Sequence, residues 1–199
     1  MKKIILNTEI QNPHFIGSWI IEPTLVCDNL IKHFEENHTK QKSGVAGERL
    51  NISVKDSVDI TMKPKEILLP GNEAFKTYFD KLFKCYKAYI EEWPFLKTMD
   101  LNLEIGYFNL QRYKPGQHFK EIHTERAGID SLHRIFVFMT YLNDVEEGGA
   151  TYFNHYDLEI KPKKGLTLIW PAEWTHSHRG NILKEGKKYI ITGWLNFAI

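Results

Sequence analysis

Histidine and acidic residues stand in the pattern His-x-Glu or His-x-Asp at three places in this sequence of 199 residues. On a β-strand, residues two apart point to the same side, so the pattern can bring an imidazole and a carboxylate to one metal ion. A second histidine would complete the set of two imidazoles and one carboxylate that binds Fe(II) in non-haem oxygenases. With nine His and 25 acidic residues, about one match is expected by chance. The surroundings of each pair must therefore decide which of the three could bind a metal ion.

Two of the three pairs are poor candidates. His33 and Glu35 fall within a helical repeat of apolar residues, where residues two apart diverge by roughly 200° and cannot share a metal ion. His155 and Asp157 closely follow the Gly148-Gly149 turn signal, and we interpret them as the polar end of a hairpin.

The third pair, His123 and Glu125, precedes the strongest predicted strand in the chain and is our candidate for two of the metal ligands. The third ligand must come from a later strand. His176 and His178 are two residues apart, so both could face the same way, and spacing alone does not separate them.

The first half of the chain is predicted to be mainly helical. Apolar residues recur at helical spacing from Leu25 to Phe34, and again in an aromatic-rich stretch that begins near Asn72 and that Pro94 ends. Residues 42–64 contain two glycines and alternating polar residues. They are predicted to be a loop with a short strand around residues 58–60, and they could form a lid over the site.

From Leu101 onward the apolar residues follow a period of two, which is typical of strands. Strands are predicted at residues 101–108, 134–142, 158–160, 166–170 and 189–197. Many short strands without alternating helices favour a β-sandwich braced by helices from the N-terminal side, an α+β fold with a mainly β core. We expect residues 1–199 to form a single domain, with 1–100 as a helical and strand support region and 101–199 as the catalytic core.

Composition narrows the classes of function. The formal net charge is +1, which does not suggest nucleic-acid binding. Cys27 and Cys85 are far apart in apolar helical patterns, and we expect buried free thiols and a cytoplasmic location. The N-terminal apolar run is too short for a signal peptide, and no stretch is long enough to cross a membrane.

The stretch from Gln111 to Trp194 resembles the catalytic domain of the prolyl 4-hydroxylase family of Fe(II)- and 2-oxoglutarate-dependent dioxygenases. The order and spacing of the matching segments together are specific, although each segment alone is not. These segments are Gln-Arg-Tyr-Lys-Pro-Gly-Gln (111–117), Tyr-Leu-Asn-Asp-Val-Glu-Glu-Gly-Gly-Ala-Thr (141–151), Lys-Pro-Lys-Lys-Gly (161–165), His-Arg-Gly (178–180) and Gly-Lys-Lys-Tyr (186–189).

This resemblance implies a double-stranded β-helix, or jelly-roll, core and the identity of the last iron ligand. In the family that histidine begins a His-x-Gly motif, which here selects His178 and leaves His176 as a surface residue or one behind the ligands. The basic residue inside Gly-x-Lys, Lys188, would meet the far carboxylate of 2-oxoglutarate, and Tyr113 and Tyr141 would supply hydroxyl groups.

Further implications concern the reaction. The resemblance implies that Arg134 and Trp194 face the primary substrate, and that the enzyme hydroxylates an unactivated carbon using Fe(II), 2-oxoglutarate and O2, with release of succinate and CO2. Ascorbate would be the reductant. The primary substrate is expected to be peptidyl proline, another protein side chain or a small molecule such as a free amino acid.

One residue departs from the family pattern, because Glu125 stands where aspartate is usual. Its extra methylene moves the carboxylate and could change how it binds metal. Two other functions are compatible with the ligands: a non-catalytic metal-binding jelly-roll module, and a zinc hydrolase, for which no His-Glu-x-x-His helix is present.

Overall fold

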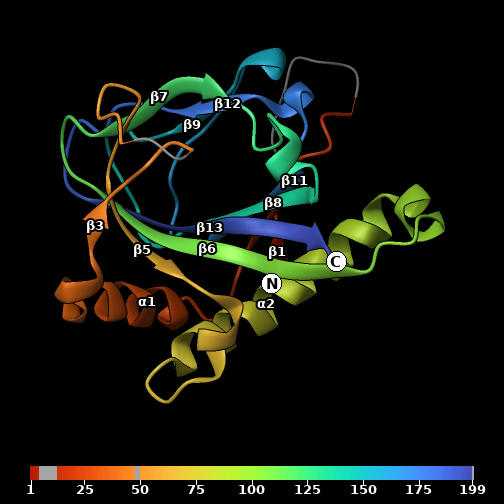
Figure 1. Ribbon diagram of the computed structural model, residues 1–199, viewed down its shortest axis with the longest axis horizontal. Helices are drawn as coiled ribbons and strands as arrows, with labels where there is room; N and C mark the ends of the chain where they lie inside the picture. The colour runs from red at the N-terminus through yellow and green to blue at the C-terminus, as the bar shows by residue number, and fades with distance from the viewer. Residues whose placement is uncertain (5–12, 48–49, 199) are drawn as a thin grey trace.

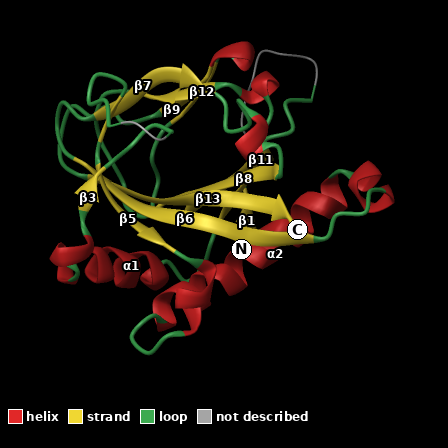
Figure 2. Ribbon diagram, viewed as in Figure 1, coloured by secondary structure: helices red, strands yellow, loops and turns green. Residues whose placement is uncertain are grey.

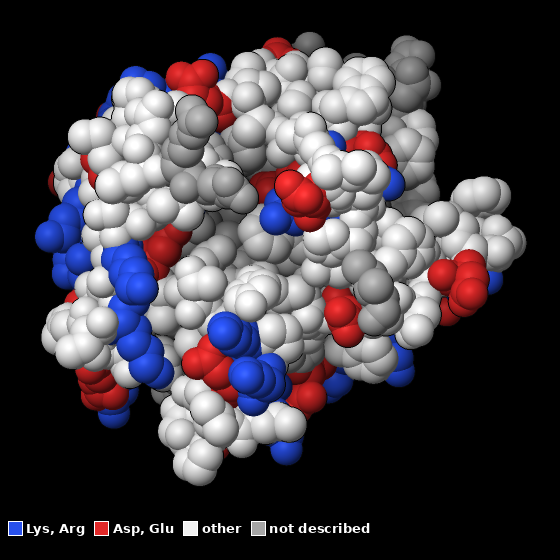
Figure 3. All heavy atoms as spheres, viewed as in Figure 1, with Lys and Arg blue, Asp and Glu red and all other residues white. Residues whose placement is uncertain are grey.

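Within the part of the chain that the structure describes, two stacked β-sheets and two α-helices form the layers (Figures 1 and 2). The structure is a computed structural model, which describes residues 1–4, 13–47 and 50–198. Both helices lie on the outer side of the larger sheet, and the smaller sheet, with β7, β9 and β12, lies on its other side. On the face shown in Figure 3, positive and negative side chains are interspersed, and the surface is hollowed near its centre.

The larger sheet is antiparallel and has eight strands among the described residues. In spatial order they are β1 (Lys2–Lys3), β2 (Gly17–Ile20), β11 (Leu166–Pro171), β8 (Arg134–Tyr141), β13 (Lys188–Phe197), β6 (Leu103–Tyr113), β5 (Val58–Met62) and β3 (Lys42–Ser43). The smaller sheet has five strands in the described chain, in the order β10 (Leu158–Ile160), β9 (Thr151–Phe153), β12 (His178–Gly180), β7 (His118–His123) and β4 (Lys55–Asp56).

Both helices form where the apolar spacing predicts them. They are α1 (Leu25–Glu36) and α2 (Glu73–Glu92), and each buries one stripe of apolar and aromatic side chains. Pro94 begins a short 3-10 turn after α2, as its missing N–H and fixed φ predict. The 3-10 turns are His38–Lys40, Pro64–Leu68, Pro94–Thr98, Ile129–Ser131, Asn154–Tyr156 and Trp174–His176.

Two apolar cores lie on opposite faces of the larger sheet, and β8 shows how the sequence divides between them. Phe136 and Phe138 pack into the core that the sheet shares with the helices. Val137, Met139 and Tyr141 pack into the core between the two sheets. A strand that is buried on both faces reads as a continuous apolar run, which explains why this segment shows little alternation.

The mainly β architecture and the helical brace confirm the predicted fold class. Strand β2 was not predicted, because its sequence, which includes a Gly and a Ser, shows no alternation of apolar and polar residues. Residues 42–64 contribute more structure than predicted, since β4 joins the smaller sheet and β5 the larger one. Residues 48 and 49 lie outside the described residues, and the lid stays a prediction, as does the division at residue 100.

The two cysteines are buried and free, as predicted. Burial raises the pKa of the Cys27 thiol to about 11 and that of the Cys85 thiol to about 12. Both thiols are therefore protonated and poorly reactive near neutral pH. Within the described ranges, neither helix has the length and apolar character that a membrane-crossing segment requires.

Leu30→Ala is expected to lower the free energy of unfolding by roughly 2–5 kcal/mol, because it leaves a cavity between α1 and the larger sheet. Leu30 is 0% exposed, whereas Leu25 on the same helix is 62% exposed and provides the matched control, Leu25→Ala. Urea unfolding measures both variants. Equal effects would contradict the assignment of the buried face of α1.

Candidate active site

The two candidate histidine ligands lie directly opposite each other on neighbouring strands. His123 is the last residue of β7 and His178 the first of β12, and the two are paired in the register of these antiparallel strands. Directly opposed residues have side chains close enough to interact, and here the ring centroids are 4.5 Å apart. The pairing therefore brings together two imidazoles that are far apart in the sequence.

Both rings present the same nitrogen to the site. His123 Nδ1 lies 2.9 Å from the carbonyl oxygen of Glu121, and His178 Nδ1 lies 2.9 Å from that of His176. A carbonyl can only accept a hydrogen bond, so each Nδ1 is a donor, and in the neutral imidazole each Nε2 keeps a lone pair that can bind a metal ion. This arrangement is typical of metal-binding histidines, whose other nitrogen is fixed by a second hydrogen bond.

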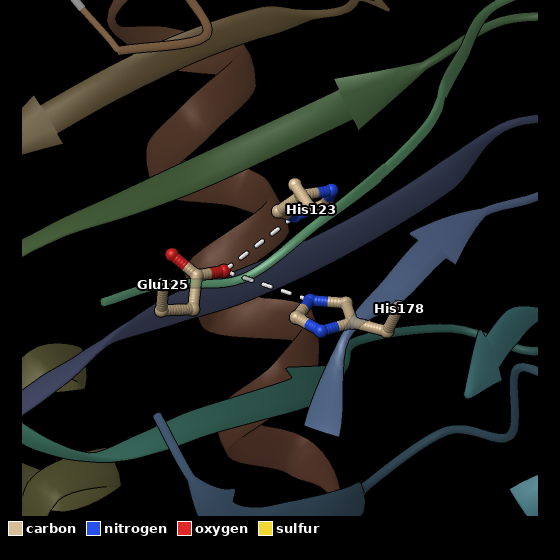
Figure 4. Close-up of side chains that lie close together, drawn as sticks. All are labelled: His123, Glu125 and His178. Atoms are coloured by element: carbon tan, nitrogen blue, oxygen red, sulfur yellow. Dashed lines mark ion pairs between the residues drawn. The ribbon is translucent and has the colours of Figure 1, made fainter. Parts of the chain in front are cut away.

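Glu125 supplies the carboxylate that faces these two nitrogens (Figure 4). Its Oε1 lies 3.6 Å from His123 Nε2 and 3.5 Å from His178 Nε2. One ligand atom from each of the three residues lies within 4.8 Å of the other two. The donor set therefore fits a metal ion held by two imidazoles and one carboxylate.

The predicted triad is thus brought together, although not by strand alternation alone. β7 ends at His123, so Glu125 lies beyond the strand. Two hydrogen bonds hold this segment instead: Thr124 Oγ1 donates to the carbonyl of Ala172 at 2.9 Å, and Arg134 donates to the carbonyl of Glu125 at 2.8 Å.

The charges of the triad suit metal binding. Burial alone would raise the pKa of Glu125, but the neighbouring imidazoles of His123 and His178, which stabilise a carboxylate when they are protonated, outweigh it and hold the pKa well below its usual range. Burial, followed by the charge of His123, lowers the pKa of His178. An ionised carboxylate and a neutral imidazole are the forms that bind metal ions.

His176 does not take part in the triad. It ends the 3-10 turn Trp174–His176, where alternation no longer applies, and its side chain is buried, not at the surface. Its Nε2 lies 2.9 Å from the carbonyl oxygen of His14, and its ring packs near Tyr156. Burial lowers the pKa of His176 to about 4, so the ring is neutral near pH 7. His176 contributes to the triad through its backbone carbonyl, which accepts the hydrogen bond from His178 Nδ1.

The two rejected pairs have other partners. Glu35 bonds to Arg112 and Tyr189, while His33 packs edge-on against Phe75, so the two side chains of this pair diverge. His155 and Asp157 lie at the turn between β9 and β10, which confirms the hairpin end.

The triad is lined by aromatic rings that the sequence analysis did not identify. Phe119 stacks on His123 with ring centroids 3.8 Å apart, and Phe153 and Trp170 contact the ring of His178. Phe119 lies on β7 with His123, so strand assignment could have found it. Phe153 and Trp170 are indistinguishable in sequence from ordinary core residues.

Lys188 is a buried amine at the start of β13, next to Tyr113 and Gly149. It is 4% exposed, and no carboxylate lies within 4.0 Å of its Nζ in the part of the chain that the structure describes. Nζ donates to the carbonyl of Gly149 at 2.9 Å and lies 4.3 Å from the ring centroid of Tyr113. A buried charge normally has an ionic partner, so this amine is suited to receive the carboxylate of a ligand.

The Gly148-Gly149 turn makes room for this lysine. Both glycines have positive φ, of 79° and 68°, which favours residues without a Cβ. A Cβ on Gly149 would also lie 3.2 Å from Lys188 Cδ. The glycine pair of the family motif thus sets the position of the lysine as well as the turn.

Tyr113 lies opposite Lys188 in the pairing of β6 with β13. Its hydroxyl donates to Gln111 at 2.8 Å, and Gln111 in turn donates to Asp59 at 3.3 Å. Asp59 forms a buried ion pair with Lys55 at 2.7 Å. Gln111 shares a strand face with Tyr113 and stands in the quoted motif, whereas nothing in the sequence linked Asp59 to the site.

Tyr141 lies in the same core between the sheets as Tyr113. Its hydroxyl lies 2.6 Å from Thr151 Oγ1 and donates to the carbonyl of Ile160 at 3.1 Å. Within the described chain no hydrogen bond joins Tyr141 to Tyr113 or Lys188. The two tyrosines are therefore not equivalent, and Tyr113 is the one in contact with the lysine.

Arg134 and Trp194 meet at the carboxylate of Glu125. The indole N–H of Trp194 donates to Glu125 Oε2 at 3.0 Å, and the Arg134 guanidinium lies 3.8 Å from the indole ring centroid. Both side chains therefore border the candidate metal ligands.

Comparisons with known proteins agree with this geometry. Residues 108–196 match the family model of the 2OG-Fe(II) oxygenase superfamily. A probable prolyl 4-hydroxylase 9 of Arabidopsis thaliana is 32% identical over 114 residues, which cover 44% of this chain and 40% of that protein. The chain thus spans well under half the length of this relative.

Solved structures extend the likeness of the fold to most of the chain. The viral collagen prolyl hydroxylase of Paramecium Bursaria Chlorella virus-1, in complex with 2OG, matches with a TM-score of 0.66 at 20% identity over 92% of this chain and 97% of that one. A Trichoplax adhaerens prolyl hydroxylase, in complex with a hypoxia inducible factor peptide fragment, matches with a TM-score of 0.65 at 17% identity, covering 90% and 83%. Residues 108–196 therefore match the 2OG-Fe(II) oxygenase superfamily in sequence and are similar to the prolyl 4-hydroxylases.

Proposed function

We propose that this protein is an Fe(II)- and 2-oxoglutarate-dependent dioxygenase that hydroxylates an unactivated carbon atom, with succinate and CO2 as the other products. The observation that carries the proposal is the convergence of His123, Glu125 and His178, with both Nδ1 atoms engaged and both Nε2 atoms free. The superfamily match over residues 108–196 supports it.

Each residue of the site has a physical role in this reaction. His123, Glu125 and His178 would hold iron on one side, leaving positions for 2-oxoglutarate and O2. The iron, the cosubstrate and O2 together would supply the oxidant, and the protein supplies positioning and exclusion of water. Lys188 would bind the far carboxylate of 2-oxoglutarate in a pocket where that charge would otherwise be costly to bury.

Tyr113 is the better placed of the two tyrosines to donate a hydroxyl to the same carboxylate, because its ring contacts Lys188. The hydroxyl would have to turn away from Gln111 to do so. We keep Tyr141 as a second donor, which would need to leave the carbonyl of Ile160.

We propose peptidyl proline as the primary substrate, with other protein side chains and free amino acids as alternatives. The prolyl hydroxylases among the similar proteins, including the one bound to a peptide fragment, support a peptide. Arg134 and Trp194 would face it from the rim of the metal centre, where Arg134 keeps 27% of its side chain exposed. Ascorbate is proposed as reductant, and the cytoplasm as location, where Cys27 and Cys85 would stay reduced.

Succinate release tests the function. Purified protein is supplied with Fe(II), 2-oxoglutarate, ascorbate and O2, with or without proline-containing peptides, and His178→Ala serves as the inactive control. We expect iron-dependent succinate formation that a suitable peptide accelerates. Metal binding without any succinate, in the presence or absence of peptides, would instead indicate a non-catalytic module.

The pH dependence of 2-oxoglutarate binding follows from Lys188. Burial lowers its pKa to about 7 in the unliganded protein, so the amine loses its charge as the pH rises through that value. A bound carboxylate favours the charged amine, so affinity is fully developed below pH 7 and falls above it. The Kd on Mn(II)-loaded protein is expected to rise about tenfold between about pH 7.5 and 8.5.

Pyruvate provides the control for this measurement. It keeps the 2-oxo acid end of 2-oxoglutarate but lacks the far carboxylate, so its Kd should not follow the titration of Lys188. The same pH-dependent rise for both ligands would locate the titrating group at the metal ligands and contradict the assignment to Lys188.

A further inference from the structure

The two carboxylate oxygens of Glu125 have different surroundings. Oε1 lies 3.6 Å from His123 Nε2 and 3.5 Å from His178 Nε2, so it points into the triad. Oε2 accepts a hydrogen bond from the indole N–H of Trp194 at 3.0 Å. One oxygen is therefore available to a metal ion, and the other already has a partner in the protein.

Arg134 fixes this arrangement from a second side. Its Nη1 donates to the backbone carbonyl of Glu125 at 2.8 Å and lies 3.8 Å from Oε2. Its guanidinium also lies over the indole ring of Trp194, 3.8 Å from the ring centroid. Stacking on an aromatic ring while the same group donates a hydrogen bond is typical of arginine. We call Trp194 and Arg134 together the carboxylate clamp.

The clamp matters because a carboxylate can bind a metal ion through one oxygen or through both. The proposed reaction requires three positions on iron beyond the protein ligands, two for 2-oxoglutarate and one for O2. A carboxylate bound through both oxygens would occupy one of these. A glutamate side chain has one more rotatable bond than aspartate, so it has more freedom to turn its second oxygen toward the metal.

We infer that Trp194, held by Arg134, is a positioning residue that restricts Glu125 to ligation through one oxygen. The clamp thereby lets a glutamate act as ligand at a position where the prolyl 4-hydroxylase family, which this chain resembles, usually has aspartate. It also keeps the third position on the metal open, so that both 2-oxoglutarate and O2 can bind. This inference rests on the proposed function, since it concerns room for 2-oxoglutarate on the metal.

Trp194→Phe tests the inference without turnover, because it removes the N–H while keeping an aromatic ring for Arg134. Binding of Mn(II), and then of 2-oxoglutarate to the Mn(II)-loaded protein, is measured by calorimetry in the absence of O2. We expect Mn(II) affinity to stay within about threefold of the original or to become tighter, and the Kd for 2-oxoglutarate to rise by about tenfold or more.

Trp93→Phe is the matched control. Trp93 lies at the end of α2, and its buried indole nitrogen has no hydrogen-bond partner among the described residues. The substitution therefore removes a tryptophan N–H without removing a hydrogen bond, and 2-oxoglutarate binding should be unchanged.

A double-mutant cycle with Glu125→Asp distinguishes a change in how the carboxylate binds the metal from a general loss of stability. Aspartate is shorter and should lose contact with the indole, so Trp194→Phe should cause no further loss of 2-oxoglutarate affinity in the Glu125→Asp protein. Arg134→Met, which removes the other half of the clamp, replaces Trp194→Phe in the cycle if that variant does not fold.

Three results would overturn the inference: unchanged 2-oxoglutarate affinity in Trp194→Phe, losses that add in the double mutant, or loss of Mn(II) binding by Trp194→Phe, which would make the indole a requirement for ligation itself. Failure of the proposed function would give a different result, because the unmodified Mn(II)-loaded protein would then not bind 2-oxoglutarate at all. The inference would be wrong in that case too.

Discussion

Glu125→Ala and His178→Ala are each expected to lower iron-dependent turnover of 2-oxoglutarate by about 10³-fold or more. Each variant removes one of three ligand atoms that lie within 4.8 Å of one another. Loss of several kcal/mol of metal-dependent stabilisation corresponds to a rate change of this size. Succinate release under saturating cosubstrate measures the effect, and Fe(II) binding measured in parallel shows whether the metal is lost.

His176→Ala is the matched control for His178→Ala. The structure shows that His178 uses only the backbone carbonyl of His176, which alanine retains. The side chain of His176 bonds instead to the carbonyl of His14, so its loss should lower stability by about 1–3 kcal/mol and leave turnover within about threefold. Normal turnover in His178→Ala, or loss of turnover only in His176→Ala, would contradict the assignment of His178 as the metal ligand and favour His176 in its place.

Lys188→Met is expected to raise the concentration of 2-oxoglutarate needed for half-maximal rate by about 10- to 100-fold. Methionine fills a similar volume, so the change removes the buried charge without leaving a large cavity. A hydrogen bond to a charged group contributes roughly 1.5–3 kcal/mol, which corresponds to this range of affinity. The measurement is the initial rate of succinate formation against 2-oxoglutarate concentration.

The neighbouring Lys187 provides the control, since it is exposed and, among the described residues, hydrogen-bonds only through its backbone carbonyl, which accepts from Asn143 at 2.8 Å. Lys187→Ala should leave the 2-oxoglutarate requirement unchanged. If the two variants behave alike, the cosubstrate does not use the buried amine, and Lys188 has a structural role.

The three candidate metal ligands could be chosen from the sequence, and their side chains do converge, but the reason for their convergence could not be predicted. Alternation on a strand predicted a shared side for His123 and Glu125, yet the strand ends at His123 and hydrogen bonds from Thr124 and Arg134 place the carboxylate. The direct pairing of His123 with His178 depends on the register of β7 and β12, which no local pattern reveals.

The helices and the long strands were predictable because each carries a repeated apolar pattern. Of the short strands, β10 was predicted at residues 158–160, whereas β12, with three residues, and β4, with two, were not, because both form by pairing with β7. Lys188 shows a related limit. Its position among exposed lysines suggested a solvated turn, and only the family resemblance pointed to a buried amine.

Anaerobic titration of the metal-free protein with Fe(II), followed by 2-oxoglutarate, tests the central claim most directly. Chelation of Fe(II) by the 2-oxo acid gives a weak charge-transfer absorption in the visible range. We predict that this band appears in the unmodified protein, saturates with 2-oxoglutarate, and is absent in His178→Ala. Absence of the band from unmodified protein with Fe(II) demonstrably bound would contradict the account and favour a metal-binding module that does not use 2-oxoglutarate.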